Sequence, residues 1–146
     1  MSAHAAPLPV TDAHLHLWDL GASPYAWLAG APALLRRTVT IEDVRADLCA
    51  LGVTRVILVQ ADDTMQDTAH LQATARAIEA HAAETGAGID RADVVGWLPL
   101  TDPDTVRAAL ARMRDEGLVR AVGVGSKDAG VLLRAVRTGQ IGRAHV

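Results

Sequence analysis

Near the amino terminus the sequence runs Val10-Thr11-Asp12-Ala13-His14-Leu15-His16-Leu17-Trp18-Asp19, which sets two histidines one residue apart at the end of an apolar run. Alternate side chains of a β-strand share a face, so Asp12, His14 and His16 would form one polar stripe on a strand here. Ala13 and Leu15 would point to the opposite side. Imidazoles projecting from the end of a buried strand are typical of a metal or acid–base site. We therefore interpret His14 and His16 as candidate metal ligands.

The His-x-His pair also has a simpler interpretation. Two histidines in a strand can face solvent or hydrogen-bond to backbone carbonyls, and their spacing alone does not separate this arrangement from a metal site. A catalytic zinc usually takes three protein ligands and keeps one open position. The sequence offers no cysteine pair and no second histidine cluster to complete such a set. A metal at this pair would therefore need further ligands from elsewhere.

Three later motifs follow the His-x-His stretch in order. They are Pro24-Tyr25-Ala26-Trp27-Leu28, Val56-Ile57-Leu58-Val59-Gln60-Ala61 and Val94-Val95-Gly96-Trp97-Leu98-Pro99-Leu100. Together the four stretches resemble the amidohydrolase superfamily, in its amidohydrolase-related branch, which includes sugar lactonases and a pyrone-dicarboxylate lactonase. The resemblance covers about residues 10–122 and implies a (β/α)8 barrel whose first strand ends in the His-x-His. It departs from the family at Val122-Gly123-Val124-Gly125, where members carry an Arg-His-like pair.

Composition limits the classes of function. The 146 residues are 50% hydrophobic and 21% charged, which is enough apolar material for one globular core, and the net charge of −3 gives no attraction to nucleic acid. The first nine residues lack the features of a signal peptide, and no run is long enough to span a membrane. We expect a cytoplasmic protein that acts on a small molecule, without nucleic-acid or membrane partners. The single cysteine, Cys49, excludes an internal disulfide and is expected in the core.

Apolar periodicity, caps and turn residues predict alternating strands and helices, which favours a parallel α/β architecture independently of the resemblance. The predicted architecture is about four parallel strand–helix units, the amino-terminal half of a (β/α)8 TIM-type barrel. After the His-x-His strand, the predicted elements are a helix from Thr40 to Gly52, a strand at Val53–Val59, a helix from Thr64 to about Glu84, a strand at Val94–Leu100, a helix from Asp102 to Gly117 and a strand at Leu118–Val124.

The residues that follow the strands are candidate substrate contacts. In a parallel barrel the loops after the strands form the catalytic mouth. The long loop at residues 21–37 therefore brings Tyr25 and Trp27 into consideration as walls of a substrate pocket, with packing of the loop onto the barrel as the alternative. Gln60 and Trp97 are expected near the ends of the next two strands, where Gln60 either contacts substrate or ties loops together.

The carboxyl-terminal end has an unusual match. Residues Ile141-Gly142-Arg143-Ala144-His145-Val146 are the translation of ATCGGAAGAGCACACGTC, the start of a common short-read sequencing adapter. We expect residues 1–140 to be a partial barrel domain and residues 141–146 to be an adapter-derived tail, with a natural tail as the alternative. A complete barrel of this kind takes about 250 residues, so the chain is expected to hold about half of one.

The sequence leaves three functional hypotheses. The first is a hydrolase that opens a lactone with an activated water, in which His14 and His16 hold a divalent metal such as zinc, or position the substrate if no metal is used. The second is a metal-dependent decarboxylase of the same superfamily. The third is that the chain as it stands is an inactive half-barrel, whose open sheet edges invite pairing with another chain.

Overall fold

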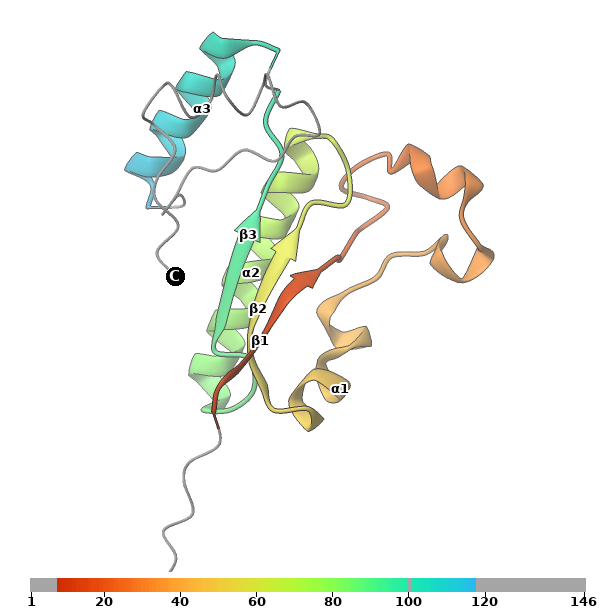
Figure 1. Ribbon diagram of the computed structural model, residues 1–146, viewed down its shortest axis with the longest axis vertical. Coiled ribbons are helices and arrows are strands. Elements are labelled where there is room, and N and C mark those ends of the chain that lie inside the picture. Colours follow the sequence, from red (N-terminus) through yellow and green to blue (C-terminus); the bar gives the residue numbers. More distant parts are fainter. Residues whose placement is uncertain (1–7, 100, 118–146) are drawn as a thin grey trace, which may run out of the picture. The chain divides into compact units, whose positions relative to one another are not determined.

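The computed structural model describes residues 8–99 and 101–117 of the chain (Figure 1). The chain divides into two compact units, Met1–Leu98 and Pro99–Val146, and each is described here by itself. The fourth predicted strand, at Leu118–Val124, and the tail at residues 141–146 lie outside the described residues. Within the described residues, no helix has the length and apolar character that crossing a membrane requires.

The first unit contains a three-stranded parallel sheet (Figure 1). Its strands are β1 (Val10–Leu15), β2 (Val53–Val59) and β3 (Arg91–Val95), in the spatial order β1-β2-β3. The pairing of β2 with β3 is regular, whereas that of β1 with β2 shifts register twice, the second time just before the strand ends. Parallel neighbours in chain order, joined by helical connections, confirm the predicted α/β class and are consistent with the amino-terminal part of a (β/α)8 barrel.

The helical connections follow the predicted capping signals, with one difference. The turn η3 (Ile41–Asp43) and the helix α1 (Arg45–Ala50) replace the single helix predicted from Thr40 to Gly52. The Asp43 carboxylate does accept the Thr40 backbone N–H, at 2.8 Å, but Val44 leaves the helical region with φ −128°, so that η3 and α1 are separate. The next helix, α2 (Met65–Thr85), is continuous and ends at Gly86 in the left-handed conformation.

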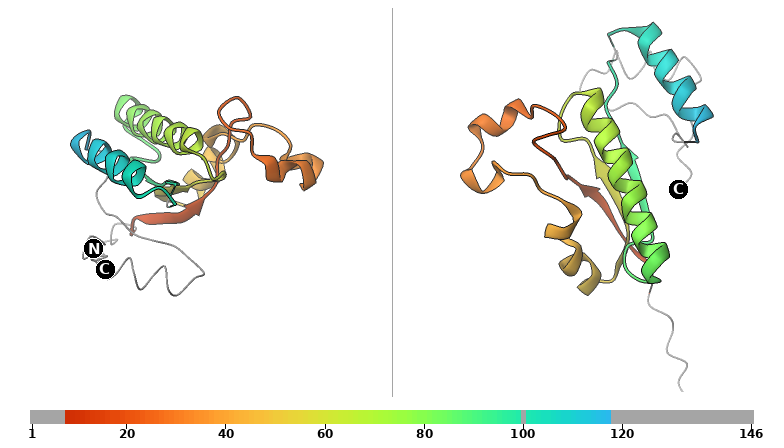
Figure 2. Two further views of the ribbon diagram at one scale, coloured as in Figure 1. Left: turned by 90° about the horizontal axis from the view of Figure 1, so that it is seen from above. Right: turned by 180° about the vertical axis from the view of Figure 1, so that it is seen from behind.

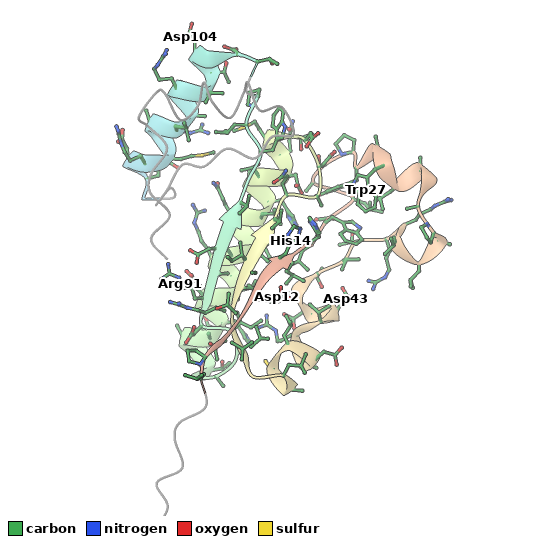
Figure 3. All side chains as sticks on the ribbon, in the orientation of Figure 1. Asp12, His14, Trp27, Asp43, Arg91 and Asp104 are labelled. Carbon is green, nitrogen blue, oxygen red and sulfur yellow. The ribbon has the colours of Figure 1, made fainter. Side chains whose placement is uncertain are left out.

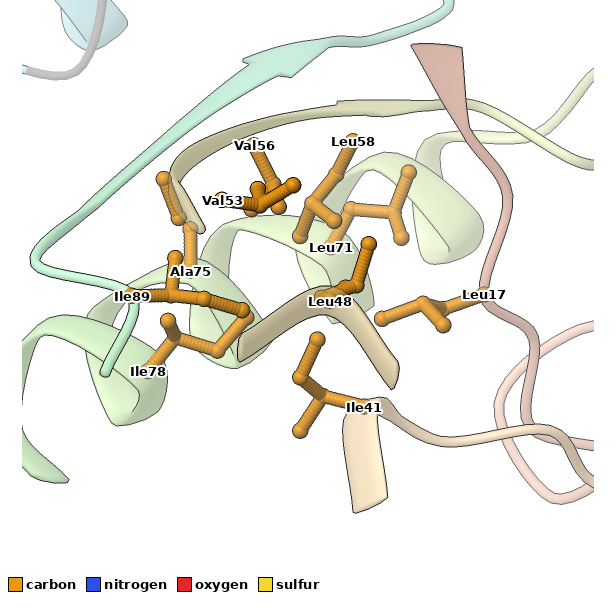
Figure 4. Packing of buried hydrophobic residues seen from close by; sticks show 11 residues of the cluster. Leu17, Ile41, Leu48, Val53, Val56, Leu58, Leu71, Ala75, Ile78 and Ile89 are labelled. Carbon is orange, nitrogen blue, oxygen red and sulfur yellow. The ribbon is translucent and has the colours of Figure 1, made fainter. Parts of the chain in front are cut away.

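The core lies between one face of the sheet and the helices α1 and α2 (Figures 2 and 4). Each large aliphatic side chain buried here contributes about 1.5–3 kcal/mol to folding relative to leaving it in water. The opposite face of the sheet is less covered, since Val95 is 50% exposed and Ile57 and Val59 are only half-buried. The principal buried residues of the core are Leu17, Ile41, Leu48, Val56, Leu58, Leu71, Ala75, Ile78, Ile89 and Ala92.

Two sequence-based expectations in this unit were wrong. The third strand begins at Arg91 and ends at Val95, not at Val94–Leu100, because a half-covered sheet accepts polar residues on its open face. Arg91 and Asp93 form an ion pair there, with Nε and Oδ2 3.1 Å apart, while Ala92 between them is buried. Cys49 is exposed rather than in the core, because Leu48 supplies the buried position of the two-turn helix α1.

The second unit contains one described helix, α3 (Pro103–Asp115). Asp102 caps it by accepting the backbone N–H groups of Asp104 and Thr105, each at 3.2 Å, and Gly117 follows its end with a φ of 69°. A proline at the first turn and a glycine just beyond the end are the typical boundaries of a helix. This confirms the helix predicted from Asp102 to Gly117.

Candidate functional site

The carboxyl ends of the three strands meet at one edge of the sheet. β1 ends at Leu15, so His16 is the first residue beyond it, and Gln60 is the first residue beyond β2. The backbone N–H of Gln60 donates to the carbonyl of Val95, the last residue of β3, at 2.9 Å. The ends of the three strands therefore lie at the same edge, as expected for parallel strands.

The two histidines of the His-x-His motif contact each other. Their Nε2 atoms are 2.9 Å apart, and the rings meet edge to face with centroids separated by 4.7 Å. Both side chains are exposed, and Figure 3 labels His14 at the end of β1. Leu17, which follows them, is 1% exposed and belongs to the core. The two imidazoles therefore lie together, as side chains on one face of a strand should.

The hydrogen bonds of His16 determine its tautomer. Its Nδ1 lies 3.0 Å from the carbonyl oxygen of Val59, and because a carbonyl only accepts, Nδ1 must carry the proton. In the neutral ring Nε2 then has a free lone pair, and the Nε2–H of His14 donates to it. A ring whose Nδ1–H donates to a backbone carbonyl presents its lone pair at Nε2, which is the tautomer that metal-ligating histidines commonly adopt. A metal ion at this pair would replace the hydrogen bond between the two Nε2 atoms, and His14 would have to give up its Nε2 proton.

The geometry of the pair is compatible with a shared metal ion. With zinc–nitrogen distances of about 2.0–2.1 Å, two ligating nitrogens are about 2.9 Å apart at a right angle and about 3.4 Å apart in a tetrahedron. The observed 2.9 Å lies within the range that a small rotation of either ring covers. No group of three or more histidine, cysteine, aspartate or glutamate side chains that could hold a metal occurs among residues 8–99 and 101–117. The role of His14 and His16 as metal ligands stays a prediction.

Asp12 does not extend the polar stripe toward the histidine rings. Its Oδ1 accepts the backbone N–H of His14 at 3.0 Å, so the carboxylate is turned toward its own strand. The register shift between Asp12 and Leu15 accompanies this bond. β1 is therefore irregular between Asp12 and Leu15, where the sequence predicts side chains that alternate strictly between the two faces of the sheet.

A pocket of about 410 Å³ adjoins His16 at the carboxyl ends of β1 and β2. Two tryptophans, Trp18 and Trp27, form part of its wall and meet edge to face with centroids 5.6 Å apart. Their indole N–H groups donate to backbone carbonyls, Trp27 to Ala61 and Trp18 to Arg37, each at 2.7 Å. Both tryptophans therefore offer carbon surface to the pocket. The pocket is lined by His16, Trp18, Trp27, Leu35, Gln60 and Ala61.

Of the four residues considered as substrate contacts or pocket walls, Gln60 and Trp27 line this pocket, whereas Tyr25 and Trp97 do not. Tyr25 is only 1% exposed, and its hydroxyl donates to Asp67 Oδ1 at 2.6 Å, so it packs the loop against the start of α2, as in the alternative interpretation. Burial, followed by the hydrogen bond to Asp67, raises the pKa of Tyr25 well above its usual value. Trp97 is half-buried beyond β3, and its backbone N–H donates to the hydroxyl of Thr68 at 2.8 Å.

Sequence reasoning missed two acidic residues in the segment after β2, Asp62 and Asp67. The cap expected at Thr64 is formed, since the Asp67 backbone N–H donates to the Thr64 hydroxyl at 3.1 Å. Its carboxylate, however, is fully buried and accepts from Tyr25, Ala61 and Asp62. The one signal in the sequence was the pair Asp62-Asp63 before the Thr64 cap, in a loop that follows a strand.

A solved structure resembles the chain. The sequence matches no known family profile, and no curated protein matches it. A crystal structure of an amidohydrolase from Burkholderia multivorans with bound zinc is similar at 25% sequence identity, with a TM-score of 0.54. The similarity covers 82% of this chain and 35% of that protein, so the chain spans about a third of its length. This similarity supports the amidohydrolase superfamily, which the sequence motifs resemble.

Proposed function

We propose that this chain is part of a hydrolase of the amidohydrolase superfamily that opens a lactone by attack of water on the ester carbonyl. One observation carries the proposal: His14 and His16 bring their Nε2 atoms to 2.9 Å beside a pocket at the carboxyl ends of parallel strands. The active sites of barrels of this kind lie at that end of the strands. The similarity to an amidohydrolase solved with zinc supports the class of reaction.

His14 and His16 are the described residues that would hold a divalent metal. Such an ion lowers the pKa of a bound water and polarises a carbonyl. The protein's part is to fix the imidazoles, and the Val59 carbonyl does this for His16 by holding its Nδ1–H at 3.0 Å. If the enzyme uses no metal, the same pair would position the substrate.

The pocket residues suggest how a lactone would be oriented. The Gln60 side-chain amide offers both a donor and an acceptor to ring oxygens or hydroxyl groups. The exposed face of Trp27, which is 43% accessible, would cover the carbon side of the substrate and exclude water from it. The lactone as substrate and the cytoplasm as location are part of this proposal.

The test is hydrolysis of a panel of sugar lactones by a full-length barrel that contains this chain. Replacing both His14 and His16 with alanine should abolish turnover, because His16 is the one imidazole among the described residues that lines the pocket and His14 is its direct neighbour. His81→Ala is the matched control, since this exposed histidine of α2 does not line the pocket. Undiminished turnover in the double variant would remove the His-x-His motif from the site.

A further inference from the structure

The loop that carries Trp27 is held by buried and partly buried hydrogen bonds to the segment that follows β2. Ser23 and Tyr25 of this loop are 6% and 1% exposed. Ser23 Oγ donates to Asp62 Oδ2 at 2.7 Å, and the backbone N–H of Tyr25 donates to the same oxygen at 3.0 Å. The Thr64 hydroxyl lies 2.7 Å from Ser23 Oγ. Because the Ser23 hydroxyl hydrogen is already donated to Asp62, Thr64 is the donor and Ser23 Oγ the acceptor in this bond. We call Ser23, Tyr25, Asp62, Thr64 and Asp67 the loop anchor.

Asp67 connects this loop to the backbone beside the pocket. Its Oδ1 accepts the Tyr25 hydroxyl at 2.6 Å, and its Oδ2 accepts the backbone N–H groups of Ala61 and Asp62 at 2.8 and 3.0 Å. The carboxylate is fully buried and lies in the first turn of α2, where the helix dipole favours a negative charge. A buried carboxylate is retained at such a place only when hydrogen bonds compensate its lost hydration.

Tyr25 is also in an unfavourable backbone conformation. Its φ of 43° and ψ of 56° lie in the left-handed region, and it is the only residue other than glycine with a positive φ in the described part of the chain. A bulky side chain adopts this conformation rarely, and strain of this kind persists only where the surroundings fix it. Here its backbone N–H and its hydroxyl are both bound by the anchor.

The anchor therefore determines where Trp27 lies. Trp27 follows Tyr25 by two residues in the turn η1 (Ala26–Gly30), and its indole N–H reaches the carbonyl of Ala61 at 2.7 Å. Asp67 binds the N–H of that same Ala61. The Asp67 carboxylate therefore fixes both the loop that carries Trp27, through Tyr25, and the residue that accepts its indole N–H, Ala61. Trp27 in turn forms a wall of the pocket together with Gln60. Figure 3 labels Trp27 on this loop.

We propose that Asp62 and Asp67 are positioning residues, which hold Trp27 as a preformed wall of the pocket through the strained backbone of Tyr25. The inference rests on the proposed function only in treating the pocket as a substrate site. A preformed wall lowers the cost of ordering the loop when a ligand binds. Loss of the anchor should therefore weaken binding of substrate more than it slows the chemical step.

The position of Trp27 can be measured without substrate. The chain has three tryptophans, so ¹H–¹⁵N spectra of the full chain show three indole N–H signals, which single Trp→Phe variants assign. Tyr25→Phe, Ser23→Ala and Asp62→Asn should each shift the Trp27 signal and speed its exchange with solvent about five- to tenfold, as loosening of one hydrogen bond implies. The Trp97 signal should stay in place. Asp63→Asn removes the same charge from an exposed neighbour and should leave all three signals unchanged.

One outcome would overturn the role of the loop anchor, and a different one would refute the proposed function. If the Trp27 signal stays unchanged in Tyr25→Phe and Ser23→Ala while the chain becomes easier to unfold, the anchor only stabilises the fold and the inference is overturned. Tyr25→Phe and Ser23→Ala keep the test available if Asp62→Asn does not fold. In the full-length barrel, the same variants should raise KM for a lactone with little change in kcat. Absence of any lactone hydrolysis would refute the proposed function, whereas the indole signals would still decide the role of the anchor.

Discussion

Replacing Gly96 with alanine should destabilise the chain through one identified contact. A Cβ atom at this position would lie 2.5 Å from Cγ2 of Thr68 and 3.1 Å from its Oγ1. Thr68 cannot swing away, because it is 3% exposed and its hydroxyl both donates to the Trp97 carbonyl at 3.1 Å and accepts the Trp97 N–H at 2.8 Å. The added methyl group therefore meets a Thr68 side chain that burial and two hydrogen bonds to Trp97 hold in place.

The magnitude follows from two opposing effects. Overpacking against a buried side chain such as Thr68 costs about 1–3 kcal/mol. Alanine also reduces the entropy of the unfolded chain, which stabilises by about 0.4–1 kcal/mol where the backbone permits it, and Gly96 has no positive φ to forbid it. We expect Gly96→Ala to lower the free energy of unfolding by about 1–2 kcal/mol. Gly30→Ala is the control, because a Cβ there meets nothing within 4 Å, and it should be neutral or slightly stabilising.

A second substitution identifies the contact responsible. Thr68→Ser removes the Cγ2 methyl but keeps the hydroxyl that binds Trp97, at a cost of about 1 kcal/mol for the lost buried methyl. In that background Gly96→Ala should cost less than in the native chain, with a coupling energy of about 1 kcal/mol. Urea unfolding followed by tryptophan fluorescence measures all four proteins. Strict additivity, or a Gly96→Ala variant as stable as Gly30→Ala, would refute the steric argument.

Two further predictions concern pH and metal binding. Burial alone would raise the pKa of Asp62, but the hydrogen bonds from Ser23, Tyr25 and Asp63 outweigh it and hold the pKa below its ordinary 3.8. A lowered folded pKa means that this carboxylate stabilises the fold above pH 3.8 and that the contribution is lost as the pH falls through the folded pKa. Acid unfolding of Asp62→Asn should therefore depend less on pH below 3.8 than that of Asp63→Asn, and equal profiles would contradict this. For metal, the 146-residue chain should bind zinc weakly through His14 and His16 and show no lactone turnover above background, because a catalytic zinc needs at least one further protein ligand. Calorimetry with and without His14→Ala and His16→Ala tests the binding, and tight stoichiometric zinc in the native chain would show that the ligand set is already complete.

Local patterns in the sequence predicted much of the first unit. β2 and the helix α2 were located because their apolar spacing, the Thr64 cap and Gly86 all act within a few residues of one another. The contact between His14 and His16 follows from the two-residue period of a strand in the same way. Such features can be predicted from neighbouring residues alone, without knowing which distant segment packs against them.

The errors came from features that depend on distant residues. Arg91-Ala92-Asp93 looks like a polar turn in the sequence, yet it forms the start of β3 because Ala92 packs into the core and the two charges pair on the open face. For Tyr25 the sequence left two alternatives, a pocket wall or packing of the loop after β1, and the structure has it buried. Its partner Asp67 is 42 residues away, and no periodicity in the sequence links the two.

The same distinction separates the two parts of the candidate site. The histidine pair depends on the end of β1 and on the Val59 carbonyl at the end of the neighbouring strand β2, which accepts from His16. The wall at Trp27 depends instead on a buried carboxylate, a strained tyrosine and a loop hydrogen bond to Ala61. Substitutions in the loop anchor can therefore alter the pocket while leaving the imidazoles in place. The chemistry and the shape of the site are accordingly open to separate tests, the first with His14 and His16 and the second with Asp62 and Tyr25.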